Sequence, residues 1–189
     1  GNAVWQTADG KNTTDYTIAS QNENRVIFKH QPDILRGGFG SGVDFHNFDF
    51  NVSFSYAFGG RGIDYTYMEL MHGGAANGKA MHKDLLKSWT PEKTGTDIPR
   101  MNKSETARQN GLSDRFFVSR SYLSIDNLTL GYTLPQSWAD RLYLSSLRVY
   151  AVADNVWLFS ARTGYDPRFG GGIGYKAMRT VSLGVTANF

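Results

Sequence analysis

One stretch of the sequence, residues 48–58, constrains the fold more than any other. Large apolar side chains occupy every second position of it: Phe48, Phe50, Val52, Phe54, Tyr56 and Phe58. Small or polar side chains fill the positions between them: Asp49, Asn51, Ser53, Ser55 and Ala57. Because successive side chains of a strand point to opposite faces, this alternation predicts a β-strand with one apolar and one polar face.

The segment before this strand alternates in the same way, and only His46 and Asn47 separate the two. So short a connection predicts a β-hairpin over residues 36–59. Residues 1–35 are polar and are expected to form a long loop. Residues 60–115 are expected to form a second long loop, which carries short helical segments at 67–72 and 82–89.

Residues 116–189 are expected to supply three more strands, at about 116–134, 147–159 and 178–189. The first of them changes its phase of alternation, which predicts a bulge near Asp126 and Asn127. The phase of the second is ambiguous beyond Ala153. A short turn with a helical segment, residues 135–146, and a glycine-rich loop, residues 161–177, are expected to connect these strands.

The polar faces of these strands indicate a membrane barrel. A soluble sheet carries Lys, Glu and other long polar groups on its outer face, whereas here that face is mostly Ser, Thr, Asn, Gly and Ala. Each strand has about the 9–11 residues that cross a bilayer when tilted. The mean hydropathy of −0.41 does not oppose this reading, because only every second residue of such a strand faces lipid.

The predicted fold class is therefore all-β, an antiparallel transmembrane β-barrel. Known bacterial barrels have about eight or more strands, so the chain is expected to supply about five strands of a larger barrel. The apolar positions of the two clearest strands are expected to face lipid: Phe48, Phe50, Val52, Phe54, Tyr56, Phe58, Val181, Leu183, Val185 and Phe189. Barrels of this class have short periplasmic turns, which would place 1–35, 60–115 and 161–177 outside the cell.

Several motifs resemble, in order and spacing, those of the SusC/RagA-type TonB-dependent transporters. The most distinctive is YLSIDNLTLGYTLP at residues 122–135. Further similar segments lie at residues 82–92, 96–100, 147–157, 164–167, 170–175 and 179–189. The resemblance covers roughly residues 37–189.

The resemblance implies a 22-stranded barrel in the outer membrane of a Gram-negative, Bacteroidetes-like cell. This chain would supply about the last five strands of that barrel, and the other strands and the plug domain lie outside this chain. It implies import of oligosaccharides or oligopeptides, driven by the TonB complex. It also implies a SusD-like lipoprotein partner at the cell surface. The terminal Phe189 resembles the signal that the barrel-assembly machinery recognises.

Aromatic side chains in the expected outer loops are candidate contacts for a substrate or partner: Tyr65, Tyr67, Trp89, Tyr165 and Phe169. No nucleic-acid partner is expected, because charges of both signs are scattered along the chain. No catalytic residues or cofactors are expected, because a transporter does no chemistry on its substrate. Asp9 and Asp15 are too few hard ligands for a calcium site, so no metal is expected.

Two other readings remain open from the residues alone. A soluble all-β sandwich that binds a ligand could bury the phenylalanine-rich face against a second sheet. A secreted glycan-acting enzyme would need a convergent pair of carboxylates, for which only Asp84 and Glu92, beside Trp89, are at hand.

Overall fold

The computed structural model describes residues 1–27, 32–161, 164–169 and 177–189. The glycine-rich run at 170–175 lies outside these residues. The chain divides into two compact units. The sheet unit comprises residues 30–62, 119–170 and 174–189, and the helical unit comprises residues 1–29, 63–118 and 171–173.

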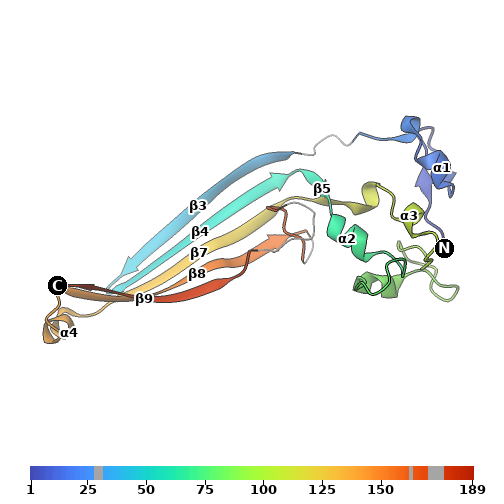
Figure 1. Cartoon of the computed structure of the whole chain (residues 1–189). Helices are drawn as coiled ribbons and strands as arrows, with labels where there is room; N and C mark the ends of the chain where they lie inside the picture. Colours follow the sequence, from blue (N-terminus) through green and yellow to red (C-terminus); the bar gives the residue numbers. More distant parts are fainter. Residues whose placement is uncertain (28–31, 162–163, 170–176) are drawn as a thin grey trace. The chain divides into compact units, whose positions relative to one another are not determined.

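The sheet unit is built on five strands in the order β3-β4-β7-β8-β9 (Figure 1). Their bounds are β3 Asp33–Phe45, β4 Phe48–Gly59, β7 Tyr122–Thr133, β8 Ser146–Ser160 and β9 Thr180–Asn188. Each strand pairs with the next one along the chain, and every pairing is antiparallel. The predicted all-β, antiparallel fold class is therefore confirmed.

Two compact connections join these strands. His46 and Asn47 link β3 to β4, and His46 has a φ of 56°, in the left-handed region that tight turns require. Between β7 and β8, Pro135 precedes helix α4 (Gln136–Arg141). Proline suits this place because it lacks the N–H that the first turn of a helix would leave unpaired. Tyr143, with a φ of 57°, follows α4 before β8 begins.

The predicted bulge near Asp126 is confirmed. The ladder between β7 and β8 shifts its register between Ile125 and Asn127, and the ladder between β4 and β7 shifts at the same level. On β8, Asn155 lies opposite this irregularity and has a φ of 51°. Because a bulge changes which side chains share a face, it accounts for the ambiguous phase of β8 beyond Ala153.

One expected strand, residues 116–134, was wrong in its extent. The structure divides it into β6 (Phe117–Ser119) and β7, and β6 pairs with β5 (Arg61–Ile63) in a separate two-stranded sheet. Phe116, directly before β6, is fully buried in the core of the helical unit. The start of this segment therefore belongs to a different core from the five-stranded sheet.

The helical unit has a small core of its own, formed by Tyr67, Met71, Leu85 and Phe116. Its elements are α2 (Tyr65–Leu70), η2 (Lys83–Lys87), α3 (Thr106–Gln109) and η3 (Asp114–Phe116). Asp64 caps α2 by accepting a 2.9 Å hydrogen bond from the backbone N–H of Tyr67. At the other end of α2, the Asn110 amide donates to the carbonyls of Met68 and Met71, at 3.1 and 2.9 Å. None of the helices in the described part of the chain is long and apolar enough to cross a membrane.

Within the expected loop at residues 1–35, the structure contains short elements. These are β1 (Trp5–Gln6), β2 (Asn12–Thr13), α1 (Tyr16–Ala19) and η1 (Asn22–Asn24). Asp15 caps α1 through a backbone N–H of its first turn. Asn24 accepts from the N–H of Ala8 at 2.8 Å and donates to the carbonyl of Ile18 at 2.9 Å. Polar side chains that suggested a loop thus serve as caps and bridges.

Candidate functional site

Large apolar side chains share one face of the five-stranded sheet, here named the apolar face. The strand register aligns them in rows, of which one contains Phe39, Phe54, Ile125 and Trp157 and another contains Val43, Phe50, Leu130, Ala151 and Leu183. Rings on neighbouring strands contact each other, with centroids 4.7 Å apart for Phe39 and Phe54 and 4.6 Å apart for Phe48 and Tyr132. Such cross-strand pairs stabilise the sheet while leaving the outer side of the rings free.

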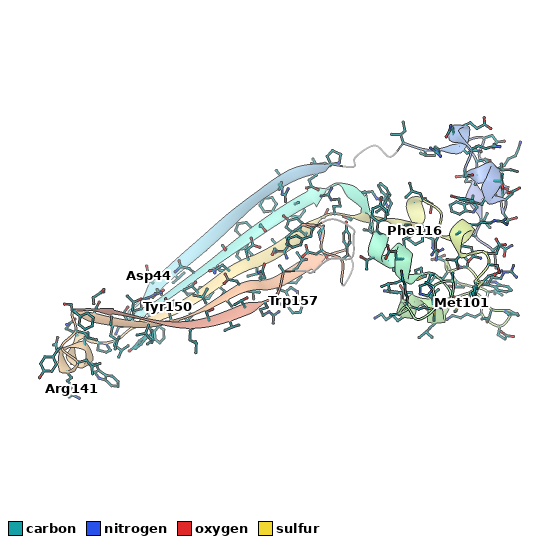
Figure 2. All side chains as sticks on the ribbon, viewed as in Figure 1. Asp44, Met101, Phe116, Arg141, Tyr150 and Trp157 are labelled. Carbon is teal, nitrogen blue, oxygen red and sulfur yellow. The ribbon has the colours of Figure 1, made fainter. Side chains whose placement is uncertain are left out.

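Much of the apolar face is exposed. The exposed fraction is 51% for Phe48, 55% for Phe39 and 85% for Leu183. Side chains project from both faces along the whole length of the strands (Figure 2). A sandwich would bury one of these faces against a second sheet. An exposed apolar surface that continues over five strands marks a place where the protein meets lipid or an apolar partner.

The side chains of β4 and β9 that were expected to face lipid all lie on the apolar face. The register connects them, since Val185 lies in the same row as Phe48, through β8 and β7. Phe189 follows β9 and is 95% exposed. Sequence reasoning missed Trp157 and Phe159 as members of this face, because the bulge shifts the phase of β8.

The opposite face, here named the polar face, carries small and polar side chains together with an ion pair between Arg148 and Asp49. The Arg148 guanidinium donates to both carboxylate oxygens of Asp49, at 2.9 and 2.5 Å. This pair spans β7 above Gly131, where a Cβ atom would overlap both side chains. The Arg148 guanidinium also lies 4.8 Å from the ring centroid of Tyr150, and that ring covers Gly184 on β9. Glycines therefore provide the room for the large groups of this face.

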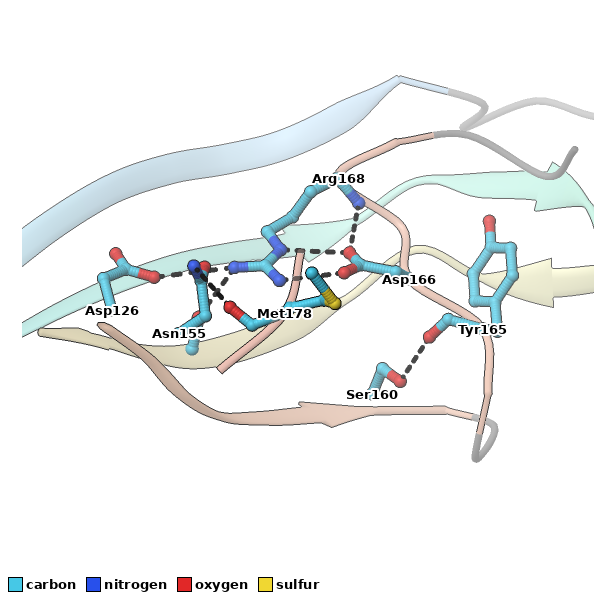
Figure 3. A network of polar contacts seen from close by, with 8 residues as sticks. Asp126, Asn155, Ser160, Tyr165, Asp166, Arg168 and Met178 are labelled. Carbon is cyan, nitrogen blue, oxygen red and sulfur yellow. Dashed lines mark hydrogen bonds and ion pairs between the residues drawn. The ribbon is translucent and has the colours of Figure 1, made fainter. Parts of the chain in front are cut away.

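Residues 164–169 lie against the polar face near the start of β7 (Figure 3). The Arg168 guanidinium donates to the two carboxylate oxygens of Asp166, at 3.0 and 2.8 Å. It also donates to the hydroxyl of Ser124 on β7 at 3.1 Å, and it lies 3.7 Å from the carboxylate of Asp126. The hydrogen bonds to Asp166 raise the pKa of Arg168, so its charge is permanent.

The aromatic residues expected to contact a substrate or partner differ in their surroundings. Tyr67 is 8% exposed in the core of the helical unit and Tyr165 is 6% exposed, so neither ring offers a free surface to a ligand. Trp89 is partly buried. Tyr65 and Phe169 are exposed, at 46% and 63%. A contact role remains a prediction for Tyr65, Trp89 and Phe169.

Three of the carboxylates considered for catalysis or calcium binding, those of Asp84, Asp9 and Asp15, have protein partners. Burial raises the pKa of Asp84, but hydrogen bonds from Lys87 and Tyr67 outweigh it, and the pKa is lowered overall. A hydrogen bond from Thr7 is the largest cause that lowers the pKa of Asp9. Asp15 caps helix α1. Among the described residues, no three His, Asp or Glu side chains form a group that could hold a metal ion.

Sequence comparison connects these features to known proteins. No family model matches the chain. It is similar to the TonB-dependent receptor P3 of Formosa agariphila, with 33% identity over 145 residues, which is 77% of this chain and 14% of the receptor. It is also similar to the TonB-dependent receptor SusC of Bacteroides thetaiotaomicron, with 26% identity over 170 residues, covering 88% of this chain and 16% of SusC. The chain therefore spans only a small part of the length of these relatives.

Comparison of structures gives the same result. This chain is similar in structure to the RagAB peptide transporter, with a TM-score of 0.79 and 25% identity. The match covers the whole of this chain and 21% of the transporter chain. The open-open state of the RagAB peptide importer matches with a TM-score of 0.72 and 25% identity. These relatives are named as receptors and importers, and none of them is named as an enzyme. The chain belongs to the SusC/RagA-type TonB-dependent transporters and forms part of a barrel wall.

Proposed function

We propose that this chain is a wall segment of an outer-membrane importer, which takes up oligosaccharides or oligopeptides with energy from the TonB complex. The observation that carries the proposal is the pairing of one continuous, exposed apolar face with a polar face of small side chains. Such a wall suits hydrocarbon on one side and a hydrated lumen on the other. The printed names of the relatives, TonB-dependent receptors and a peptide importer, support this class of transport.

The backbone of the sheet supports the same proposal. Among the residues that the structure describes, the edge strands β3 and β9 each pair with one neighbouring strand of the sheet. In a bilayer, unpaired backbone groups at a sheet edge are strongly unfavourable, so a spanning sheet must close into a barrel. We infer that further strands of the same transporter, 22 in all by resemblance, pair with β3 and β9, and that a plug domain fills part of the lumen.

The sidedness of the wall follows from its connections. The compact turns at 46–47 and 134–145 would face the periplasm, since outer-membrane barrels keep their short turns there. Residues 1–32, 60–121 and 161–179 would then lie at the cell surface. We propose that these segments contact a SusD-like lipoprotein and the incoming substrate, with Tyr65, Trp89 and Phe169 as candidate contact residues.

Uptake by cells tests the proposal. Cells that carry the intact transporter should accumulate a labelled oligosaccharide or oligopeptide, and deletion of the transporter or of TonB should abolish this uptake. The protein should sediment with outer membranes and require detergent for extraction, and a SusD-like lipoprotein should co-purify with it. Release of the intact protein in soluble form without detergent would contradict the proposal.

A further inference from the structure

The turn at residues 164–169 is closed by its own charges. The Asp166 carboxylate accepts hydrogen bonds from the backbone N–H of Arg168 at 3.0 Å and from two nitrogens of the Arg168 guanidinium. Asp166 is only 6% exposed, and the Arg168 side chain is 17% exposed. A charge withdrawn from water to this extent is tolerated only when it is paired and hydrogen-bonded. The turn is therefore held in one conformation by a charged pair.

The same guanidinium attaches the turn to the sheet (Figure 3). Arg168 donates to the hydroxyl of Ser124, a residue of the polar face that is 1% exposed. Asp126 is the bulge residue of β7, and bulges redirect side chains that would otherwise follow the alternation of the strand. Its carboxylate lies 3.7 Å from the Arg168 guanidinium. A second attachment comes from β8, where the Ser160 hydroxyl donates to the carbonyl of Tyr165 at 2.9 Å.

Burial of the strands at this level agrees with these attachments. Ala57, Tyr122 and Ser124 are all polar-face positions at this end of β4 and β7, and all are buried, with 0%, 6% and 1% exposed. Further along the same face, Asn51 and Thr186 are exposed. The polar face is thus covered at the level of the turn, whereas it is open at Asn51 and Thr186.

Phe169 ends this turn with a free surface. Its ring is 63% exposed, and the Arg168 guanidinium lies 5.5 Å from the ring centroid. A cation at this distance from an aromatic ring attracts it and restricts its orientation. An exposed, oriented ring offers a stacking surface to a passing molecule.

We propose that residues 164–169 form an inward-folded loop, fixed to the inner wall of the barrel, that narrows the passage and presents Phe169 to the molecules moving through it. Arg168 is the positioning residue. This inference rests on the proposed function, because the polar face must line the lumen. It goes beyond that function by assigning a constriction and the residue that holds it.

Cysteine labelling of the intact, purified transporter in proteoliposomes tests the inference. The chain has no cysteine, so once any cysteines elsewhere in the transporter are replaced, Phe169→Cys gives a single reactive site. We expect a small maleimide to label this site readily. We expect a long polyethylene-glycol maleimide to label it far more slowly than it labels Lys79→Cys, which lies in an exposed connection. Adding Arg168→Met should restore fast labelling by the long reagent, because the anchor is lost. Asp166→Asn should act in the same direction if Arg168→Met lowers the yield of folded protein.

Arg148→Met is the matched control, since it breaks an ion pair elsewhere on the polar face and should leave labelling at position 169 unchanged. Equal labelling of Phe169→Cys and Lys79→Cys by the long reagent would overturn the inference, as would an unchanged rate in both anchor variants. Ser182→Cys and Leu183→Cys separate this outcome from failure of the proposed function. A water-soluble maleimide should reach the first and not the second, and the reverse pattern would contradict the lumen assignment itself.

Discussion

Replacing Leu183 by arginine should destabilise the transporter far more than replacing its neighbour Ser182. Leu183 lies near the middle of β9 on the apolar face, in one row with Ala151 and Leu130, and is 85% exposed. In the proposed orientation its side chain enters hydrocarbon, where arginine near the bilayer midplane costs about 2–4 kcal/mol. Ser182 points to the polar face, so arginine there can stay hydrated and should cost about 0.5 kcal/mol.

At about 1.4 kcal/mol for each factor of ten, this cost for Leu183→Arg corresponds to a roughly 30- to 1000-fold loss in the folding equilibrium. The measurement is denaturant unfolding of the intact transporter in phospholipid bilayers, with the folded fraction read from the electrophoretic mobility of unheated samples. Phe54→Arg and Ser53→Arg on β4 provide a second matched pair on the two faces. Equal losses for both members of each pair, or larger losses on the polar face, would refute the assignment of faces.

Gly131→Ala should lower the free energy of unfolding by about 1–3 kcal/mol in the same assay, because the added Cβ would overlap the Asp49–Arg148 pair. Gly95→Ala is the control, since a Cβ there meets nothing within 4 Å. Equal effects of the two substitutions would argue against the packed pair. Phe116→Ala should lower the stability of the helical unit by about 3–5 kcal/mol, measured by hydrogen exchange of that unit. Leu86→Ala, at an 86% exposed position, should change the stability of the helical unit by about 0.5 kcal/mol or less. An equally small effect of Phe116→Ala would disprove the separate core. Since the pKa of Asp84 is lowered below its ordinary 3.8, its contacts should stabilise the helical unit fully above that pH and lose their contribution as the pH falls through the lowered value. Asp84→Asn should flatten this acid loss in thermal unfolding, and an identical pH profile in the variant would contradict the interpretation.

The strands could be predicted from the sequence where large and small residues alternate without interruption. Phe48 to Phe58 alternate with period two, and the structure contains β4 there. The fold class followed from this pattern because the residue types of both faces are explicit in it. The β-bulge at Asp126 could also be predicted from the sequence, because the apolar residues before and after it alternate in opposite phases.

Prediction failed where a distant partner determines the role of a residue. Phe116 continues the apolar texture of the following segment, yet its side chain is buried with Tyr67 in another unit. Trp157 changes its apparent face because of Asn155, whose left-handed conformation carries no reliable signal in the sequence.

The anchor at Arg168 was missed for the same reason. The sequence shows only Asp166, Pro167 and Arg168 in succession, whereas the partner Ser124 lies far away in the chain. An acid and an arginine on either side of a proline are compatible with a closed turn, but nothing in the sequence shows which strand the turn contacts. Tyr165 was expected as a candidate contact for a ligand, but it is 6% exposed, beside the hydrogen bond from Ser160 to its carbonyl.

Which face of β4 touches lipid decides whether the five-stranded sheet is the wall of a membrane barrel. Nitroxide labels placed one at a time at positions 48–58 of the intact transporter in bilayers would measure this through collision rates with oxygen, which is concentrated in lipid, and with a water-soluble nickel complex. If the apolar face touches lipid, we expect accessibility to alternate with a period of two. Oxygen accessibility should be high at even-numbered positions, and nickel accessibility should be higher at odd-numbered positions that the structure leaves open, such as Asn51. Immobile labels shielded from both reagents at Phe50 and Phe54, as in a core buried by protein, would contradict it.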